Sequence, residues 1–184
     1  MASVPRLPIV GVIGSSADAH QDRAAALGAW LAGQGVHLLT GGGPGVMQAV
    51  SKAFVETPGR KGLVIGIIPA ASEISLDPKK GYPNDWVEVP IFTHLHLSGE
   101  QGEKPLSRNH LVVLSSAVII AMPGGTGTAS EVRLAMKYRR PLIAYLRSRE
   151  EIAGLPPDAR VEPDLDRIKT FIAEELAKAR CKCL

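Results

Sequence analysis

Short apolar segments recur along the chain and alternate with longer segments whose apolar residues follow a helical period. A short apolar run between turn residues is typical of a buried strand, and apolar residues at i, i+3 and i+4 are typical of an amphipathic helix. We expect strands at residues 7–14, 36–40, 62–68, 86–89, 118–121 and 141–146. We expect helices at residues 21–34, 46–56, 106–115 and 164–179, and one more that begins near Thr126 and contains Glu131. The alternation predicts an α/β fold of the Rossmann-like, doubly wound type, with a mainly parallel sheet and helices on both faces.

Glycine, threonine and proline residues indicate where some of these helices begin or end. Gly35 is expected to close the first helix, and Pro44 suits the first turn of the second. Thr126 and Thr128 are candidates to cap the helix that contains Glu131.

The chain has 184 residues, which is a natural length for one domain. We expect a single domain over residues 1–184, with a core at about 7–180 and flexible ends. Hydrophobic residues make up 45% of the chain and aromatic residues only 4%. This aliphatic composition suits parallel strands that helices cover on both faces.

The net charge is +3, and the excess of basic residues is small and scattered, which argues against a nucleic-acid partner. No apolar run approaches the ~18 residues of a membrane span, and no secretory signal is evident, so we expect a cytoplasmic protein without membrane contact. The cysteines, Cys181 and Cys183, lie in the last four residues. We interpret them as part of a solvated tail, although a C-terminal lipid-attachment motif is the alternative.

Three glycine-containing loops directly follow expected strands, at Gly14–Ser15, Gly41–Gly45 and Gly124–Gly127. Parallel sheets of this type bind ligands beyond the carboxyl ends of their strands, so three such loops together predict a binding site. Their spacing matches neither the dinucleotide-binding fingerprint nor a Walker-type loop, which argues against a dehydrogenase or an ATPase.

The run from Pro123 to Glu131 carries the most specific chemistry. The free N–H groups and the positive end of the following helix favour an anion such as phosphate. A carboxylate at Glu131, one turn into that helix, is unfavourable for phosphate but suits chemistry on an adjacent sugar. Ser15 and Ser16 could donate hydrogen bonds to the same ligand.

These two motifs, Gly41–Met47 and Pro123–Glu131, resemble those of the LOG family over residues 7–146. Members of that family are cytokinin riboside 5′-monophosphate phosphoribohydrolases, often labelled lysine decarboxylases. The resemblance implies that Arg108, which precedes Glu131 by 23 residues, and Glu131 form the catalytic pair. An exposed ion pair without function is the alternative. The resemblance also indicates a single nucleotide-binding domain whose ligand-binding candidates are Gly14, Ser15, Gly42, Gly43, Gly45, Asn109, Gly124, Gly125, Thr126, Gly127 and Thr128.

Two positions depart from the LOG pattern, because Asn109 replaces a lysine and Ser130 replaces an acidic residue. Arg108–Asn109 and Ser115–Ser116 instead resemble the related molybdenum cofactor carrier proteins, which share the fold and bind their ligand without turnover. The regular glycine motif is closer to the enzymes.

Two main functions therefore remain open. The first is hydrolysis of the N-glycosidic bond of a nucleoside 5′-monophosphate, in which Glu131 stabilises an oxocarbenium-like sugar and orients water. The second is binding or carriage of a nucleotide or phosphorylated pterin without chemistry, and a structural nucleotide-binding subunit is a third possibility. We expect no cofactor and no metal, because no third ligand accompanies His94 and His96. Lysine decarboxylation is disfavoured, since no lysine has a suitable setting for pyridoxal phosphate.

Two further expectations concern the surroundings of this site. His110 follows Asn109 on a predicted helix and is a lesser catalytic candidate. Family members are generally homo-oligomers, and the apolar residues Leu111, Val112 and Leu114 are compatible with a homodimer or a larger assembly.

Overall fold

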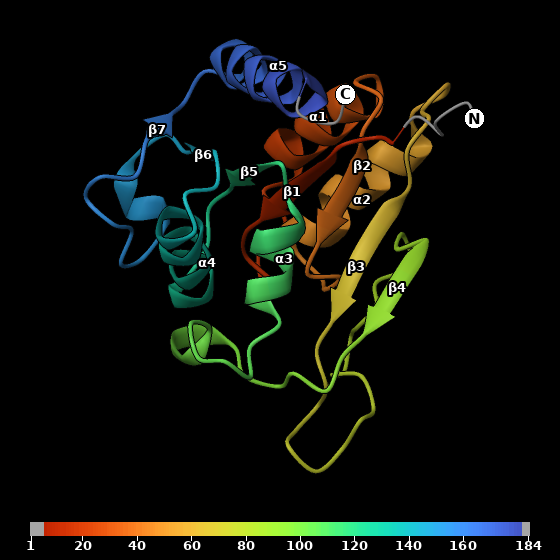
Figure 1. Cartoon of the computed structure of the whole chain (residues 1–184), viewed down its shortest axis with the longest axis vertical. Helices are drawn as coiled ribbons and strands as arrows, with labels where there is room; N and C mark the ends of the chain where they lie inside the picture. Colours follow the sequence, from red (N-terminus) through yellow and green to blue (C-terminus); the bar gives the residue numbers. More distant parts are fainter. Residues whose placement is uncertain (1–5, 182–184) are drawn as a thin grey trace.

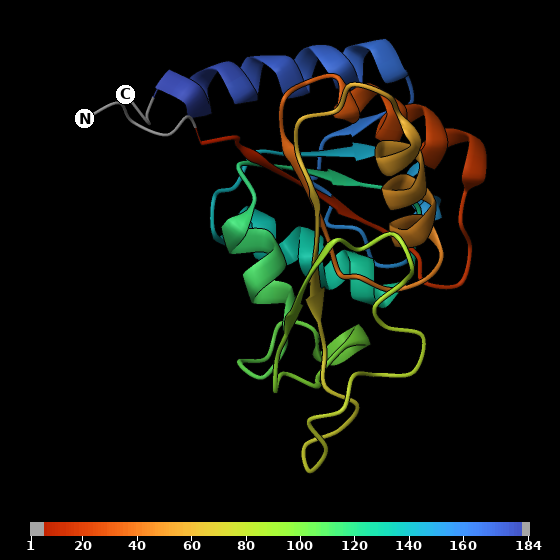
Figure 2. The same cartoon turned by 90° about the vertical axis from the view of Figure 1, so that its right-hand side faces the viewer.

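A computed structural model describes residues 6–181 of the chain as one α/β domain in which helices cover both faces of a sheet (Figures 1 and 2). The strands are β1 (Ile9–Ile13), β2 (His37–Thr40), β3 (Val64–Ile68), β4 (Val89–Phe92), β5 (Val118–Ala121), β6 (Leu142–Tyr145) and β7 (Val161–Glu162). The α-helices are α1 (Gln21–Ala32), α2 (Val46–Glu56), α3 (Asn109–Ser115), α4 (Thr126–Lys137) and α5 (Leu165–Cys181). Two 3₁₀ turns, η1 (Gly99–Gln101) and η2 (Arg149–Glu151), lie in the loops. Of the ends that we predicted to be flexible, residues 1–5 and 182–184, which include Cys183, lie outside the described residues. Cys181, which we assigned to a solvated tail, is the last residue of α5.

The strand order is β4-β3-β2-β1-β5-β6-β7, and every pairing between these strands is parallel. The chain builds the sheet outward from β1 to β4, crosses over through α3, and continues on the other side of β1 with β5 (Figure 1). This reversal confirms the predicted doubly wound, Rossmann-like fold. It also places the loops that follow β1 and β5 side by side at the carboxyl edge of the sheet, where folds of this type bind their ligands.

Two hydrophobic cores flank the sheet. One core packs α1, α2 and α5 against one face, and the other packs α3 and α4 against the opposite face. In β1, Val10 and Val12 contribute to the first core and Ile13 to the second. Because successive side chains of a strand point to opposite faces, a continuous apolar run is what two covered faces require. The described helices include none that is both long and apolar enough to cross a membrane.

Two strands differ from the prediction. The strand expected at 86–89 is displaced to Val89–Phe92, because Asn84 fixes the preceding residues as a turn by accepting the Trp86 N–H at 3.1 Å. The two-residue strand β7 was missed, since it forms only through main-chain bonds such as Leu146 N–H to Glu162 O at 3.2 Å. A strand this short has no periodicity that a sequence can show.

The predicted helix ends were partly wrong. α1 ends at Ala32 with Gly33 as its C-cap, and Gly35, which we expected to close it, adopts φ +63° in the turn to β2. Pro44 precedes the N-cap Gly45 and so lies outside the first turn of α2. At α4 the N-cap is Gly125, without a side-chain hydrogen bond, so the predicted capping by Thr126 and Thr128 is wrong. α3 begins at Asn109 rather than at residue 106.

Candidate functional site

The three glycine-containing loops meet at the carboxyl ends of β1, β2 and β5. The Ser15 N–H donates to the Pro123 carbonyl at 2.9 Å, which joins the loop after β1 to the loop after β5. The Val46 N–H donates to the Ser15 carbonyl at 2.9 Å, which joins the start of α2 to the same loop. The central loop is therefore held on both sides, and Gly14 and Gly45 serve to bring these segments close together.

The N-terminus of α4 opens onto this junction. Gly125 and Thr126 are exposed, and Gly124 and Gly127 are half-buried. No side chain of the described residues caps the helix, so the first N–H groups of α4 lack side-chain acceptors. Thr128 is buried, and its hydroxyl packs against Gly124 rather than capping the helix. An exposed, uncapped helix start has the N–H groups and the dipole that attract an anion.

Arg108 and Glu131 form an ion pair beside this helix start. Arg108 Nη1 lies 3.3 Å from Glu131 Oε1, and the two side chains are 11% and 9% exposed. The alternative of an exposed surface pair is therefore wrong. Burial raises the pKa of Glu131 from 4.5 to about 7, although the nearby Arg108 guanidinium lowers it. A carboxyl group with this pKa exchanges a proton near neutral pH.

The Gly41–Gly43 segment forms the floor under two side chains from other elements. A Cβ at Gly41 would overlap the Arg108 guanidinium, and a Cβ at Gly43 would overlap the ring of Tyr82. The three glycines are buried, and Gly42 adopts φ +75°. Gly42 and Gly43, which we predicted as ligand contacts, thus pack mainly against the protein.

Asn84 attaches the turn between β3 and β4 to this floor. Its main-chain N–H donates to the Gly42 carbonyl at 2.8 Å, and its Nδ2 donates to the Gly43 carbonyl at 2.8 Å. Neither Asn84 nor Tyr82 was singled out from the sequence, because the segment 69–85 has only the signature of a polar loop.

Asn109 and Ser15, which we predicted as ligand contacts, already form hydrogen bonds with other groups of the protein. The buried Asn109 donates from Nδ2 to Ser130 Oγ at 3.2 Å, and Ser130 Oγ donates to the Gly127 carbonyl at 2.7 Å. Asn109 and Ser130, the two departures from the LOG pattern, thus link α3 to the first turn of α4. Ser15 Oγ accepts the Ala17 and Asp18 N–H groups at 3.1 and 3.0 Å, which leaves its hydroxyl proton free to donate.

A second ion pair, missed from the sequence, holds the loop after β5 in place. Both Nη atoms of Arg23 lie 2.8 Å from the carboxylate of Glu151. The Glu151 carbonyl accepts the Gly124 N–H at 2.9 Å. Arg23 and Glu151 are 128 residues apart, so no local pattern could indicate that they meet.

The remaining candidates lie in other settings. His110 Nδ1 lies 2.7 Å from the Tyr138 hydroxyl, and its Nε2 faces the carbonyls of Glu103 and Lys104. Within residues 6–181 no group of three or more metal-ligating side chains comes together.

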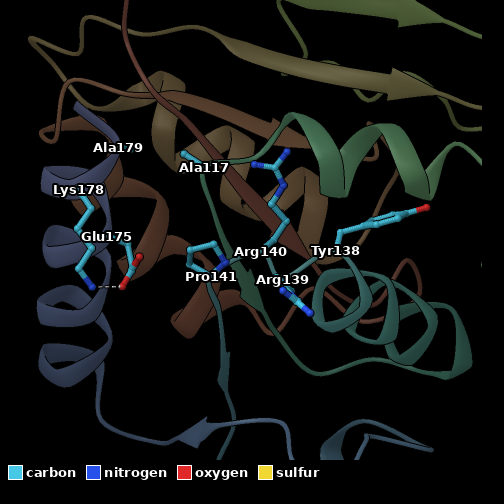
Figure 3. A pocket seen from close by; sticks show the side chains of 8 residues that line it. All are labelled: Ala117, Tyr138, Arg139, Arg140, Pro141, Glu175, Lys178 and Ala179. Atoms are coloured by element: carbon cyan, nitrogen blue, oxygen red, sulfur yellow. Dashed lines mark hydrogen bonds and ion pairs between the residues drawn. The ribbon is translucent and has the colours of Figure 1, made fainter. Parts of the chain in front are cut away.

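A hollow of about 450 Å³ lies elsewhere on the molecule (Figure 3). Its walls include Ala117 and Pro141, which directly precede β5 and β6. It therefore lies at the amino ends of these strands, at the edge of the sheet opposite the glycine loops. Figure 3 shows Lys178 paired with Glu175 at its rim, at 2.6 Å.

The fold and the loops together define a Rossmann-like protein with an exposed, uncapped helix start beside the point where the strand order reverses, between β1 and β5. A model of the SLOG cluster4 family matches residues 7–166, and the chain belongs to this family. A protein of Archaeoglobus fulgidus is 34% identical over 152 residues, which cover 82% of this chain and 87% of the relative.

Two solved structures show a further similarity. The molybdenum cofactor carrier protein of Chlamydomonas reinhardtii is 30% identical, with a TM-score of 0.66, over 94% of this chain and 99% of that one. The molybdenum cofactor binding protein of Rippkaea orientalis is 30% identical, with a TM-score of 0.65, over 91% of this chain and 98% of that one. The narrower resemblance to cytokinin phosphoribohydrolases stays a prediction.

Proposed function

We propose that the protein binds a phosphorylated small molecule at the N-terminus of α4 and acts as a carrier of a molybdenum cofactor-type pterin. The observation that supports this most directly is the exposed, uncapped start of α4 at the switch point of the sheet. The similarity to two molybdenum cofactor proteins, over more than nine-tenths of the chain, favours a phosphorylated pterin as the ligand.

The phosphate would accept hydrogen bonds from the N–H groups of Gly125, Thr126 and Gly127, and Ser15 would add a hydroxyl donor. Charge-assisted bonds of this kind are stronger than bonds between neutral groups. Arg108 would attract the same anion from the side, because its guanidinium has donors beyond the one that faces Glu131.

A Thr126→Asp protein tests the phosphate site. A carboxylate at this exposed position would repel the ligand phosphate, and we expect binding of the molybdenum cofactor, measured by titration, to weaken at least tenfold. Thr170→Asp is the matched control, because it places the same change on an exposed position of α5. Equal affinities of the two variants would contradict the proposal.

A phosphoribohydrolase is the second candidate, and the buried Arg108–Glu131 pair is the observation that favours it. Water would attack C1′ as the bond between C1′ and the base nitrogen breaks, and the products would be ribose 5-phosphate and the free base. The Glu131 carboxylate would stabilise the developing positive charge on the sugar and accept a proton from the water. That proton would finally reach the leaving base.

Release of adenine from AMP, followed by chromatography, separates the two candidates. A hydrolase would release adenine, and Glu131→Gln would slow the release at least a hundredfold, since the amide carries no charge. If the unchanged protein releases no base while it binds the phosphorylated pterin, the carrier function alone remains.

A further inference from the structure

Tyr82 is a half-buried aromatic residue that the proposed phosphate and sugar contacts do not use. It lies on the segment between β3 and β4, which extends beyond the carboxyl end of β3 (Figure 1). This end of the sheet also carries the glycine loops. The ring is therefore at the correct edge of the sheet to meet a ligand.

Hydrogen bonds hold the turn that carries Tyr82, both at Tyr82 itself and at Asn84. The Tyr82 N–H donates to the Lys79 carbonyl at 3.0 Å, and the buried Asn84 makes its two bonds to Gly42 and Gly43. The ring then lies over Gly43, where any other residue would place a Cβ. A ring held in this way loses little further freedom when a ligand packs on it.

Tyr82 and Arg108 lie on the same glycine segment. The Arg108 guanidinium covers Gly41 and the Tyr82 ring covers Gly43. The Cα atoms of residues two apart are separated by at most about 7 Å. The Tyr82 ring and the Arg108 guanidinium thus cover glycines that are only two residues apart.

The start of α4, the Gly41–Gly43 segment and Tyr82 each follow a different strand, so the order of the strands in the sheet gives their order along its carboxyl edge. α4 follows β5, the glycine segment follows β2, and Tyr82 follows β3, which lies three positions from β5 in the sheet. At about 4.8 Å per strand, these positions span about 14 Å. A free phosphate would occupy only the α4 end, whereas a phosphate joined to a ring system could reach both ends.

We propose that Tyr82 recognises the planar nitrogen heterocycle of the phosphorylated ligand by stacking against it. This inference rests on the proposed phosphate site at α4. Purines and pterins share the flat π-face that an aromatic side chain binds, so the assignment names their common chemistry.

The test compares heterocyclic phosphates with a phosphate that has no heterocycle. Binding of AMP, neopterin phosphate and ribose 5-phosphate is measured by calorimetry for the unchanged protein and for Tyr82→Leu and Tyr82→Phe. We expect Tyr82→Leu to weaken binding of the heterocyclic ligand about tenfold or more and to leave ribose 5-phosphate binding within about twofold. Tyr82→Phe keeps the ring and should keep the affinity.

Tyr138→Leu is the matched control for the loss of a tyrosine ring. Tyr138 follows the last residue of α4, about 18 Å along the helix from the phosphate end, and lines the hollow in Figure 3. We expect this variant to bind all three ligands like the unchanged protein. Thermal unfolding of each variant checks that it is folded.

Several outcomes would overturn the assignment. If Tyr82→Leu weakens all three ligands equally, or none, the ring only supports the glycine segment, and the proposed function stands. Loss of heterocycle binding in Tyr82→Phe would contradict stacking even if Tyr82→Leu does not fold. If the unchanged protein binds only ribose 5-phosphate, the role of Tyr82 fails and the phosphate site survives. If it binds none of the three, both proposals fail.

Discussion

At the scale of the residue, the central feature is a carboxylate buried against a single guanidinium. Glu131 has the Arg108 Nη1 at 3.3 Å and little exposure to solvent. The desolvation that raises its pKa outweighs the attraction of Arg108, which leaves the group near its midpoint at neutral pH. A group with this property suits proton transfer, and it also makes the stability of the fold depend on pH.

The pH dependence follows from the difference between the folded pKa of about 7 and the ordinary value of 4.5. Below pH 4.5 the carboxyl is protonated in both states, and between pH 4.5 and 7 the folded state retains a proton that the unfolded state has lost. The contribution of Glu131 to stability is therefore fully present below pH 4.5 and is lost as the pH rises to 7. We expect this loss to be on the order of 3 kcal/mol.

Glu131→Gln should remove this dependence. Urea unfolding of both proteins at pH 4.5 and pH 8 gives the difference between their free energies of unfolding at each pH. Other carboxyl groups contribute alike to both proteins and cancel. A difference that stays constant between the two pH values would contradict the raised pKa.

At the scale of the element, the position of the loop after β5 depends on an ion pair between α1 and η2, which are far apart in the sequence. The paired Arg23 and Glu151 position the segment whose carbonyl binds the Gly124 N–H. The Arg23 guanidinium, as the main cause, also holds the pKa of Glu151 below its ordinary value. The start of α4 is thus set by α1 and η2 as well as by its own glycines.

We expect Glu151→Gln to weaken phosphate-ligand binding severalfold and to speed amide hydrogen exchange in residues 124–128, because the bidentate pair is lost. Glu88→Gln is the matched control. It breaks a similar bidentate pair with Arg60, at 2.6 and 2.9 Å, just before β4 and so at the other edge of the sheet. Equal effects of the two changes on ligand binding would show that Glu151 acts only through general stability.

At the scale of the whole molecule, α3 presents two leucines away from the core. Val112 and Val113 are buried against the sheet, while Leu111 and Leu114 are 38% and 42% exposed. The edge strand β4 also exposes Val89 and Ile91. We propose that the exposed leucines of α3 belong to a homodimer interface, because exposed apolar side chains on one helix favour contact with a second chain.

Light scattering should therefore give about two chain masses in solution. We expect Leu111→Lys to shift the protein to a monomer, because a buried, unpaired ammonium group is costly at an interface. Leu63→Lys is the control, since Leu63 has a similar exposure of 41% and precedes β3 at the amino edge. A monomeric unchanged protein, or a dimer that tolerates Leu111→Lys, would exclude this interface.

The sequence by itself determined the class of fold and indicated the edge of the sheet at which the candidate site lies. Its apolar runs and helical spacing predicted six of the seven strands, one displaced by three residues, and all five α-helices. The glycines that follow β1, β2 and β5 indicated the edge of the sheet that carries the loops. These features are local, because each depends on the side-chain period or the backbone freedom of a few neighbouring residues.

The tertiary structure alone decided how distant groups combine. The packing of α3 against α4 buries Glu131 beside Arg108, the β3–β4 turn brings Tyr82 over Gly43, and Arg23 reaches Glu151 from the first helix. Burial, pKa and contact between such residues depend on where whole elements lie in space. No residue pattern within one segment contains that information.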